Sequence, residues 1–186
     1  YVPVKMKIFS WWGDKNHERD TFMTPFDSIK YHKQLLQTSF ACVDPKTGEI
    51  KAWVGGINFK WFKYDHVTAK RQVGSTFKPL LYTLAITDAG YTPETVIPGG
   101  AVTLSGKTIG FGGGTMAHCL ANSINGAAWQ LMATIGVKRT IEFAELCGIK
   151  AKLPHYPSIA LGAADIPLTE MLQAYTMFPN RGYNTP

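Results

Sequence analysis

The chain has 186 residues, which is enough for one domain with a sizeable core and leaves little room for two. With 45% hydrophobic, 12% aromatic and 17% charged residues, its composition is that of a globular protein and excludes a long disordered tail. The net charge of +6 would suit nucleic acid, an anionic membrane surface or an acidic polymer, but it singles out none of them. The densest aromatic and basic stretch, residues 59–64, is short and favours a packed loop over a platform for stacking bases. Neither an apolar run of roughly 18 residues nor a signal-peptide pattern occurs.

The first predicted elements are an arm and a helix. Residues 1–25 show little periodicity and are predicted to form a lead-in arm or linker. A helix is expected to follow, with Asp27 or Ser28 as its N-terminal cap. Its predicted apolar face holds Ile29, Leu35 and Leu36. Residues 40–54 then predict a β-hairpin that turns at residues 45–48, where proline and glycine favour a tight turn.

Residues 71–79, Arg-Gln-Val-Gly-Ser-Thr-Phe-Lys-Pro, place a serine and a lysine where a turn becomes a helix. Side chains three positions apart lie on one helix face, so the amine of Lys78 can reach the hydroxyl of Ser75. Free backbone N–H groups in a first helical turn favour negative charge beside Ser75, and Pro79 is tolerated there. The pair predicts a serine that forms an acyl-enzyme. The spacing alone is weak evidence, because a chain of this composition is expected to contain roughly 0.5 occurrences of Ser-x-x-Lys by chance.

The remainder of the chain predicts a loop and then helices. Residues 92–114 are rich in proline and glycine and predict a loop, and helical patterns follow at 115–122, 126–135, 138–146 and 167–178. The triplet Ser123-Ile124-Asn125 follows the first of these helices at a separation that lets it meet Ser75 and Lys78 across a cleft. Three cysteines, Cys42, Cys119 and Cys147, sit in apolar settings and predict buried small side chains. Their number and spacing predict neither a disulfide framework nor a metal site.

Residues 71–79, 120–125 and 159–163, with the later Ala-Tyr pair at 174–175 and Asn-Arg-Gly at 180–182, resemble the transpeptidase domain of class A, bifunctional penicillin-binding proteins. The hairpin at 44–56 is similar to the first hairpin of that domain, and residues 24–29 resemble the stretch that joins it to the glycosyltransferase domain in some members.

The resemblance implies an α+β fold of the penicillin-binding protein and serine β-lactamase-like kind, with an antiparallel sheet packed on helices beside a helical subdomain, incomplete here. It divides the chain into residues 1–25, a linker from the glycosyltransferase side, and residues 26–186, a partial transpeptidase domain.

The implied activity is that of a peptidoglycan D,D-transpeptidase. By resemblance, Ser75 attacks the carbonyl between the two terminal D-alanines of a stem peptide, and Lys78 is its base. Ser123 relays a proton, and Asn125 hydrogen-bonds the substrate amide. At an ordinary lysine pKa only roughly 0.04% of Lys78 would be neutral at pH 7, so the site must lower that pKa. The resemblance implies no cofactor and no metal.

These four residues also have simpler interpretations. Taken alone, Ser123 or Asn125 would more often cap a helix, and Lys78 would be a solvated lysine. The surrounding family motifs favour the catalytic interpretation.

The sequence departs from the family pattern at two places. Val73 stands where proline is common, which we expect to loosen the turn. Lys46-Thr47-Gly48 matches a family triplet by its letters but lies in the predicted hairpin turn, ahead of Ser75, and predicts turn chemistry only. The family's own Lys-Thr-Gly strand follows the Ser-x-Asn triplet and is not found before Pro186. We therefore expect part of a longer protein, with low activity by itself and an exposed, unpaired sheet edge.

By resemblance the partners are peptidoglycan stem peptides or their lipid-linked precursor, β-lactam antibiotics, and cell-wall synthesis proteins. The expected place is the bacterial cell envelope, on the periplasmic side of the inner membrane, with membrane contact only through an N-terminal anchor outside these residues.

A β-lactamase or D,D-carboxypeptidase is the first alternative to the transpeptidase function. A non-catalytic envelope module that binds through the basic surface and Trp11-Trp12 is the second. Nucleic-acid binding rests on charge alone and is not expected.

Overall fold

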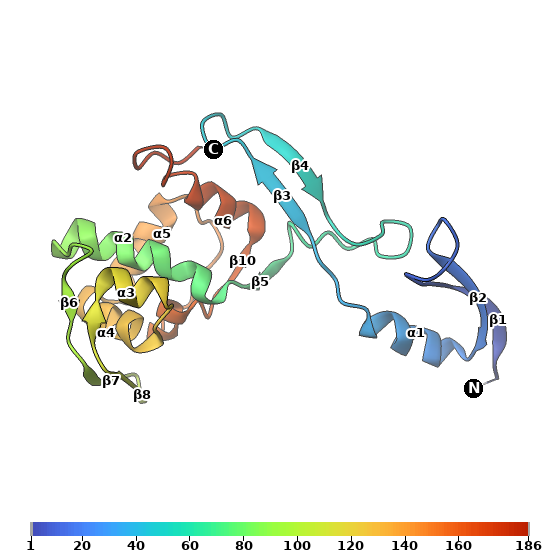
Figure 1. The fold of residues 1–186 in the computed structure, drawn as a ribbon, viewed down its shortest axis with the longest axis horizontal. Coiled ribbons are helices and arrows are strands. Elements are labelled where there is room, and N and C mark those ends of the chain that lie inside the picture. The colour runs from blue at the N-terminus through green and yellow to red at the C-terminus, as the bar shows by residue number, and fades with distance from the viewer. Residues whose placement is uncertain (1, 186) are drawn as a thin grey trace.

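The computed structural model describes residues 2–185, which form two lobes joined by a hairpin (Figure 1). The N-terminal lobe holds β1, β2 and α1, the larger lobe is mainly helical, and β3 and β4 span the distance between them. The strands are β1 (Val4–Phe9), β2 (Glu18–Met23), β3 (Phe40–Val43), β4 (Ile50–Val54), β5 (Lys70–Gln72), β6 (Val96–Ile97), β7 (Gly100–Leu104), β8 (Lys107–Phe111), β9 (Gly114–Thr115) and β10 (Asp165–Pro167). The helices are α1 (Pro25–Gln34), α2 (Lys78–Ala89), α3 (Met116–Ala121), α4 (Asn125–Ile135), α5 (Val137–Leu146) and α6 (Leu168–Tyr175), with 3₁₀ helices η1 (Gly74–Phe77) and η2 (Pro157–Leu161).

The predicted α+β fold is confirmed. Within residues 2–185 the strands form five two-stranded antiparallel ladders. Three of them, β1–β2, β3–β4 and β7–β8, pair neighbours in the sequence. The other two, β5–β10 and β6–β9, join distant segments and fix loops onto the helical lobe. No helix among the described residues combines the length and apolarity that crossing a bilayer requires.

The N-terminal lobe contains a hairpin where the sequence predicted an arm without periodicity. The turn between β1 and β2 is held by Asp14, whose Oδ1 accepts from the backbone N–H groups of Asn16 (2.8 Å) and Glu18 (3.0 Å). Ile8 and Phe9 at the end of β1 are buried. Because these turn bonds come from one side chain and the apolar positions are few, the hairpin leaves a weak pattern in the sequence. The expected division at residue 25 remains a prediction.

Helix α1 is present as predicted, but it begins at Pro25, ahead of the predicted caps, and its apolar face also differs from the prediction. The cap is Thr24, whose hydroxyl oxygen accepts from the N–H of Asp27 at 3.1 Å, ahead of Pro25. None of the residues of α1 is buried, Ile29 is 58% exposed, and Leu36 beyond its end is 90% exposed. The apolar residues at helical spacing therefore do not bury a face here.

Residues 57–64 fold back from the end of β4 onto the N-terminal lobe. His32 of α1 stacks on Trp61 with a centroid distance of 5.3 Å, and Phe9 meets Phe62 edge to face at 5.4 Å. The carboxylate of Glu18, only 5% exposed, lies 2.5 Å from the amine of Lys60. The hydrogen bond from Lys60 holds the pKa of Glu18 below its ordinary value. This stretch is thus a packed loop, as predicted, and we call it the docking loop.

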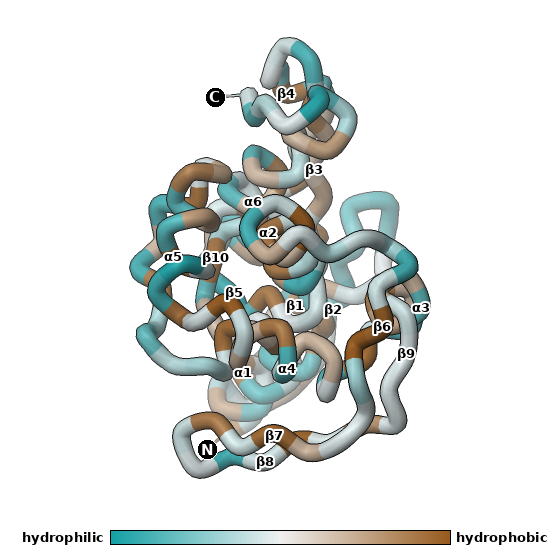
Figure 2. Tube along the Cα trace, turned by 90° about the vertical axis from the view of Figure 1, so that its left-hand side faces the viewer, coloured by the Kyte–Doolittle hydropathy of each residue, from teal (hydrophilic) through white to brown (hydrophobic). Residues whose placement is uncertain are grey.

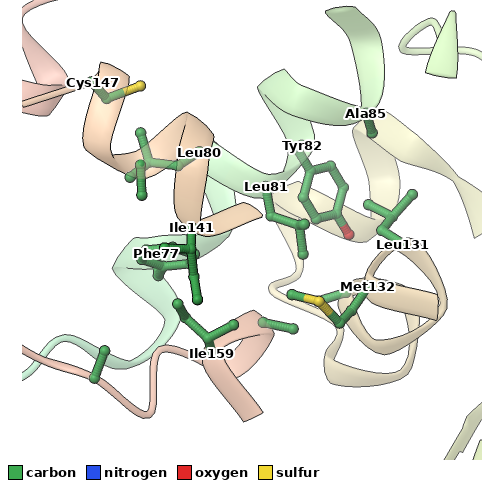
Figure 3. Close-up of a cluster of buried hydrophobic side chains, with 14 of the residues drawn as sticks. Phe77, Leu80, Leu81, Tyr82, Ala85, Leu131, Met132, Ile141, Cys147 and Ile159 are labelled. Atoms are coloured by element: carbon green, nitrogen blue, oxygen red, sulfur yellow. The ribbon is translucent and has the colours of Figure 1, made fainter. Parts of the chain in front are cut away.

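The core of the helical lobe is centred on α2. Phe77, Leu81 and Ile159 are fully buried, and α2 packs against α4 and α5 (Figure 3). Burying one such side chain contributes about 2 kcal/mol. The helices predicted at 115–178 are confirmed. Of the cysteines, Cys119 and Cys147 are buried as predicted, whereas Cys42 is exposed. That prediction was wrong because β3 pairs only with β4 among the described strands, and Cys42 lies on an uncovered face of the ladder.

The segment 92–114, predicted as a loop, contains the hairpin β7–β8. The indole N–H of Trp129 on α4 donates to the carbonyl of Val102 at 3.1 Å. A Cβ on Gly126 would lie 2.8 Å from the Cβ of Phe111, so only glycine lets β8 lie this close to α4. Part of β7 is hydrophobic in Figure 2. The hairpin is therefore fixed by tertiary contacts that the glycine-rich sequence of this segment does not indicate.

We predict that Glu18→Gln loosens the docking loop, because glutamine keeps the shape but removes the charge that pairs with Lys60 and Lys7. Amide hydrogen exchange of residues 57–64 at pH 7 is expected to accelerate. Since the folded pKa of Glu18 is lowered, its contribution is present above the ordinary value of 4.5 and is lost as the pH falls through the folded pKa. Glu49→Gln is the control, because Glu49 is 65% exposed and, within residues 2–185, pairs only with nearby Lys51. Equal exchange in the two variants at pH 7 would contradict the prediction.

Candidate active site

Ser75 lies in the 3₁₀ turn η1, immediately before α2, where the sequence predicted a turn to become a helix. Gly74 makes this turn with φ +56°. Pro79 has no N–H to close an α-helical bond onto the carbonyl of Ser75, and the N–H of Lys78 donates to it instead. The side chain of Ser75 is exposed to solvent. The sequence therefore places the hydroxyl at the open end of the central helix.

Val73, which was expected to loosen this turn because it replaces a common proline, makes a hydrogen bond of its own. Its N–H donates to the carbonyl of Ala164 at 3.1 Å, a bond that the family's usual proline could not make. The substitution removes the rigidity of proline and adds one hydrogen bond between the turn and the segment that leads into β10.

Lys78 is a buried cation with three oxygen partners. Its residue is 1% exposed. The amine Nζ donates to the carbonyl oxygen of Ser123 at 2.6 Å, to the hydroxyl oxygen of Ser123 at 3.0 Å and to Oδ1 of Asn125 at 2.7 Å. An ammonium group has three N–H donors, and each of them has an acceptor here. The alternative of a solvated lysine is thus excluded by the geometry.

Two effects oppose each other in the protonation of Lys78. Burial lowers the pKa of the amine, because the charged form loses hydration. The three neutral oxygen acceptors favour the charged form, and no carboxylate pairs with it within the described residues. The lysine is therefore oriented by dipoles and keeps a lowered pKa, which a base that works near neutral pH requires.

The Ser-x-Asn triplet lies in the connection between α3 and α4. Ser123 adopts the left-handed conformation with φ +51°, which costs a residue with a side chain about 1 kcal/mol. This conformation directs both its carbonyl and its hydroxyl oxygen at Lys78. The N-cap of α4 is Ile124, without a side-chain hydrogen bond, so neither Ser123 nor Asn125 caps the N-terminus of α4. Ser123 does help to end α3, because its N–H and that of Ile124 donate to the carbonyls of Leu120 and Cys119 in a left-handed C-terminal turn.

The structure brings three of the four predicted residues into contact, namely Lys78, Ser123 and Asn125. Ser75 lies one turn before Lys78, and within residues 2–185 its hydroxyl makes no hydrogen bond to that amine. The triplet at residues 46–48 lies in the β3–β4 turn, where Oδ1 of Asp44 accepts from the N–H groups of Lys46 and Thr47. Its predicted role in turn chemistry is confirmed.

The sequence pattern did not indicate a role for Tyr175. Its hydroxyl donates to the carbonyl of Thr76, beside Ser75, at 2.6 Å across 99 positions of sequence. Its ring also lines a cleft of about 330 Å³ between η1, β5, β10 and α6, which contains neither Ser75 nor Lys78. Among the described residues, no group of three potential metal-binding side chains is close enough to hold an ion.

Comparison with known proteins places this geometry in a family. Residues 1–36 match the penicillin-binding protein middle domain, and residues 38–186 match the penicillin-binding protein transpeptidase domain. Penicillin-binding protein 2D of Bacillus subtilis is 35% identical over 161 residues, which cover 79% of this chain and 23% of that protein. Penicillin-binding protein 1A of Neisseria cinerea is 32% identical over 172 residues, or 83% of this chain and 21% of that protein. The chain thus spans between a fifth and a quarter of the length of these relatives.

Solved structures agree with these matches. The crystal structure of penicillin-binding protein 1A from Haemophilus influenzae superimposes with a TM-score of 0.70 at 28% identity, covering 77% of this chain and 23% of that one. PonA1 from Mycobacterium tuberculosis, solved in complex with penicillin V, gives a TM-score of 0.69 at 22% identity and shares the fold, over 86% of this chain and 49% of that one. The chain therefore belongs to the transpeptidase family of penicillin-binding proteins, a family of acyl-serine enzymes of peptidoglycan synthesis.

Proposed function

We propose that the protein is a peptidoglycan D,D-transpeptidase whose nucleophile is Ser75 and which β-lactams acylate at that residue. The observation that supports this most directly is the buried Lys78, held by Ser123 and Asn125 one helical turn after an exposed serine. The matched family provides the reaction type.

In the proposed acylation step, neutral Lys78 is the base. A neutral amine has two N–H donors, which the carbonyl of Ser123 and Oδ1 of Asn125 can accept, and this leaves its lone pair for the proton of the Ser75 hydroxyl. The Ser75 oxygen bonds to the carbonyl carbon of the penultimate D-alanine, and the amide bond to the last D-alanine breaks. The departing nitrogen takes its proton from Lys78 through the hydroxyl of Ser123, which lies 3.0 Å from Nζ.

In the second step, the amine of a neighbouring stem peptide attacks the acyl-serine. Ser123 relays the proton of that amine back to Lys78, the new amide bond forms, and Ser75 regains its hydroxyl proton. Asn125, at the start of α4, hydrogen-bonds the amide of the bound stem peptide with the part of its side chain that Lys78 does not occupy. The cross-link is complete without a cofactor.

The oxyanion requires two N–H donors, and the backbone N–H of Ser75 is one of them. In the family the second comes from the Lys-Thr-Gly strand, and loss of one donor costs about 100- to 1000-fold in rate. We accordingly propose that these 186 residues alone react more slowly than a chain that also carries such a strand. We further propose that the protein acts at the periplasmic face of the inner membrane, in contact with cell-wall synthesis proteins.

The β-lactamase and carboxypeptidase alternatives use the same serine and differ in the step after acylation. A hydrolase would release the adduct to water, whereas a transpeptidase keeps it. Steady turnover of penicillin by the full-length protein would favour the hydrolase.

We predict a mass increase equal to one penicillin on the full-length protein, and no increase in Ser75→Ala. The reason is that the adduct is an ester of the Ser75 oxygen. Intact-mass spectrometry after incubation with penicillin measures it. Ser28→Ala, in the N-terminal lobe, is the matched control and is expected to gain the same mass as the wild type. An adduct on Ser75→Ala, or none on the wild type, would refute the proposed nucleophile.

We predict that the acylation rate rises with pH through an apparent pKa below 10.5, because burial lowers the pKa of Lys78 and its neutral form is the base. Lys78→Met is expected to slow acylation on the order of 100- to 10,000-fold and to remove this rise. Stopped-flow acylation by a fluorescent penicillin from neutral to alkaline pH measures both. Lys46→Met, in the β3–β4 turn, should keep the wild-type profile. A rise that persists in Lys78→Met would assign the base to another group.

A further inference from the structure

Within the turn that carries Ser75, the hydroxyl of Thr76 donates to the carbonyl of Val73 at 2.7 Å. No side chain caps η1 at Val73, and Pro79 removes the N–H that would bond the carbonyl of Ser75 in an α-helix. A 3₁₀ turn has poorer hydrogen-bond geometry than an α-helix. The exposed position of Ser75 means that little packing fixes it directly. Contacts made by other parts of the chain therefore add to this local bond in placing Ser75.

Those contacts come from the segment between η2 and α6. The N–H of Gly74 donates to the carbonyl of Gly162 at 3.0 Å. The two glycines cross so closely that a Cβ on Gly162 would lie 1.8 Å from the carbonyl oxygen of Gly74. On the other side of Ser75, the hydroxyl of Tyr175 donates to the carbonyl of Thr76 at 2.6 Å. The turn is thus held at the residue before Ser75 and at the residue after it.

Tyr175 is suited to hold this carbonyl. It is the last residue of α6, and its ring meets Phe178 edge to face at a centroid distance of 5.3 Å. A tyrosine hydroxyl is protonated at neutral pH and can donate this bond, and burial raises its pKa further. Thr76, whose carbonyl accepts this bond, lies two residues before Lys78 at the start of α2.

We propose that Tyr175 is a positioning residue for acylation, which fixes the η1 turn and with it the distance between the Ser75 oxygen and the amine of Lys78. This inference rests on the proposed function of Ser75. Lys78 is fixed independently by its three bonds to Ser123 and Asn125, so movement of η1 changes the serine and leaves the lysine in place. Small displacements of a reacting atom reduce rates by up to about 100-fold.

The test is Tyr175→Phe in the full-length protein, which removes one oxygen and keeps the ring. We expect the acylation rate constant at saturating penicillin to fall about tenfold, while the dissociation constant of the non-covalent complex and the apparent pKa of the pH profile stay unchanged. Amide exchange in residues 74–78 is expected to accelerate. Tyr156→Phe is the matched control, because Tyr156 is exposed and lies before η2 in the same half of the chain.

The proposal is overturned if the acylation rate constant of Tyr175→Phe equals that of Tyr156→Phe. It is also overturned if the rate constant falls only in proportion to a smaller folded fraction while amide exchange in residues 74–78 is unchanged. Gly162→Ala, which must displace Gly74, is expected to slow acylation further if the variant folds. Failure of the proposed function is recognised separately. In that case the wild type is not acylated or Ser75→Ala still is, and the exchange measurement decides the structural part of the inference by itself.

Discussion

The burial of one amine, that of Lys78, is the constraint on which the rest of this site depends. A cation removed from water needs a hydrogen-bond acceptor for each of its donors, because an unpaired buried donor costs about 1–3 kcal/mol and a charged one more. Here the acceptors come from Ser123, in the turn between α3 and α4, and from Asn125 at the start of α4. The left-handed conformation of Ser123 ends α3 and also directs two oxygens at Lys78. Helix α2 carries the lysine and also forms the centre of the core. The same helix therefore stabilises the lobe and positions the amine.

The polypeptide that links the two lobes is itself packed onto the N-terminal lobe. The docking loop returns from β4 to the N-terminal lobe, where Glu18 pairs with Lys60 and aromatic rings from both sides pack together. The chain then runs directly into β5, which pairs with β10, and into the turn with Ser75. One continuous stretch thus connects the part matched by the middle-domain family to the residues in front of α2.

Much of the helical lobe, and the meeting of Lys78 with the Ser-x-Asn triplet, could be predicted from the sequence, because helical periodicity and motif spacing are local properties. The hairpin at residues 40–54 was also predictable from its turn residues. The hairpins at 4–23 and 100–111 were not, since one depends on the turn bonds of Asp14 and the other on a contact from Trp129. Thr24 replaced the expected helix caps, and Cys42 proved exposed, because cap choice and strand cover depend on neighbours. Tyr175 reaches the Ser75 turn over 99 positions, a separation at which local pattern carries no information.

The pairing of β5 with β10 has a consequence for how the protein is made. Residues 70–72 can form their ladder only with residues 165–167. The ladder in front of the serine therefore closes a loop of sequence that contains most of the helical lobe. Contacts between residues so far apart in the sequence generally form late in folding. Closing the long loop between them costs conformational entropy before the contact itself contributes any stability. The turn that carries Ser75 is therefore complete only once β10, at the far end of the helical lobe in the sequence, has paired with β5.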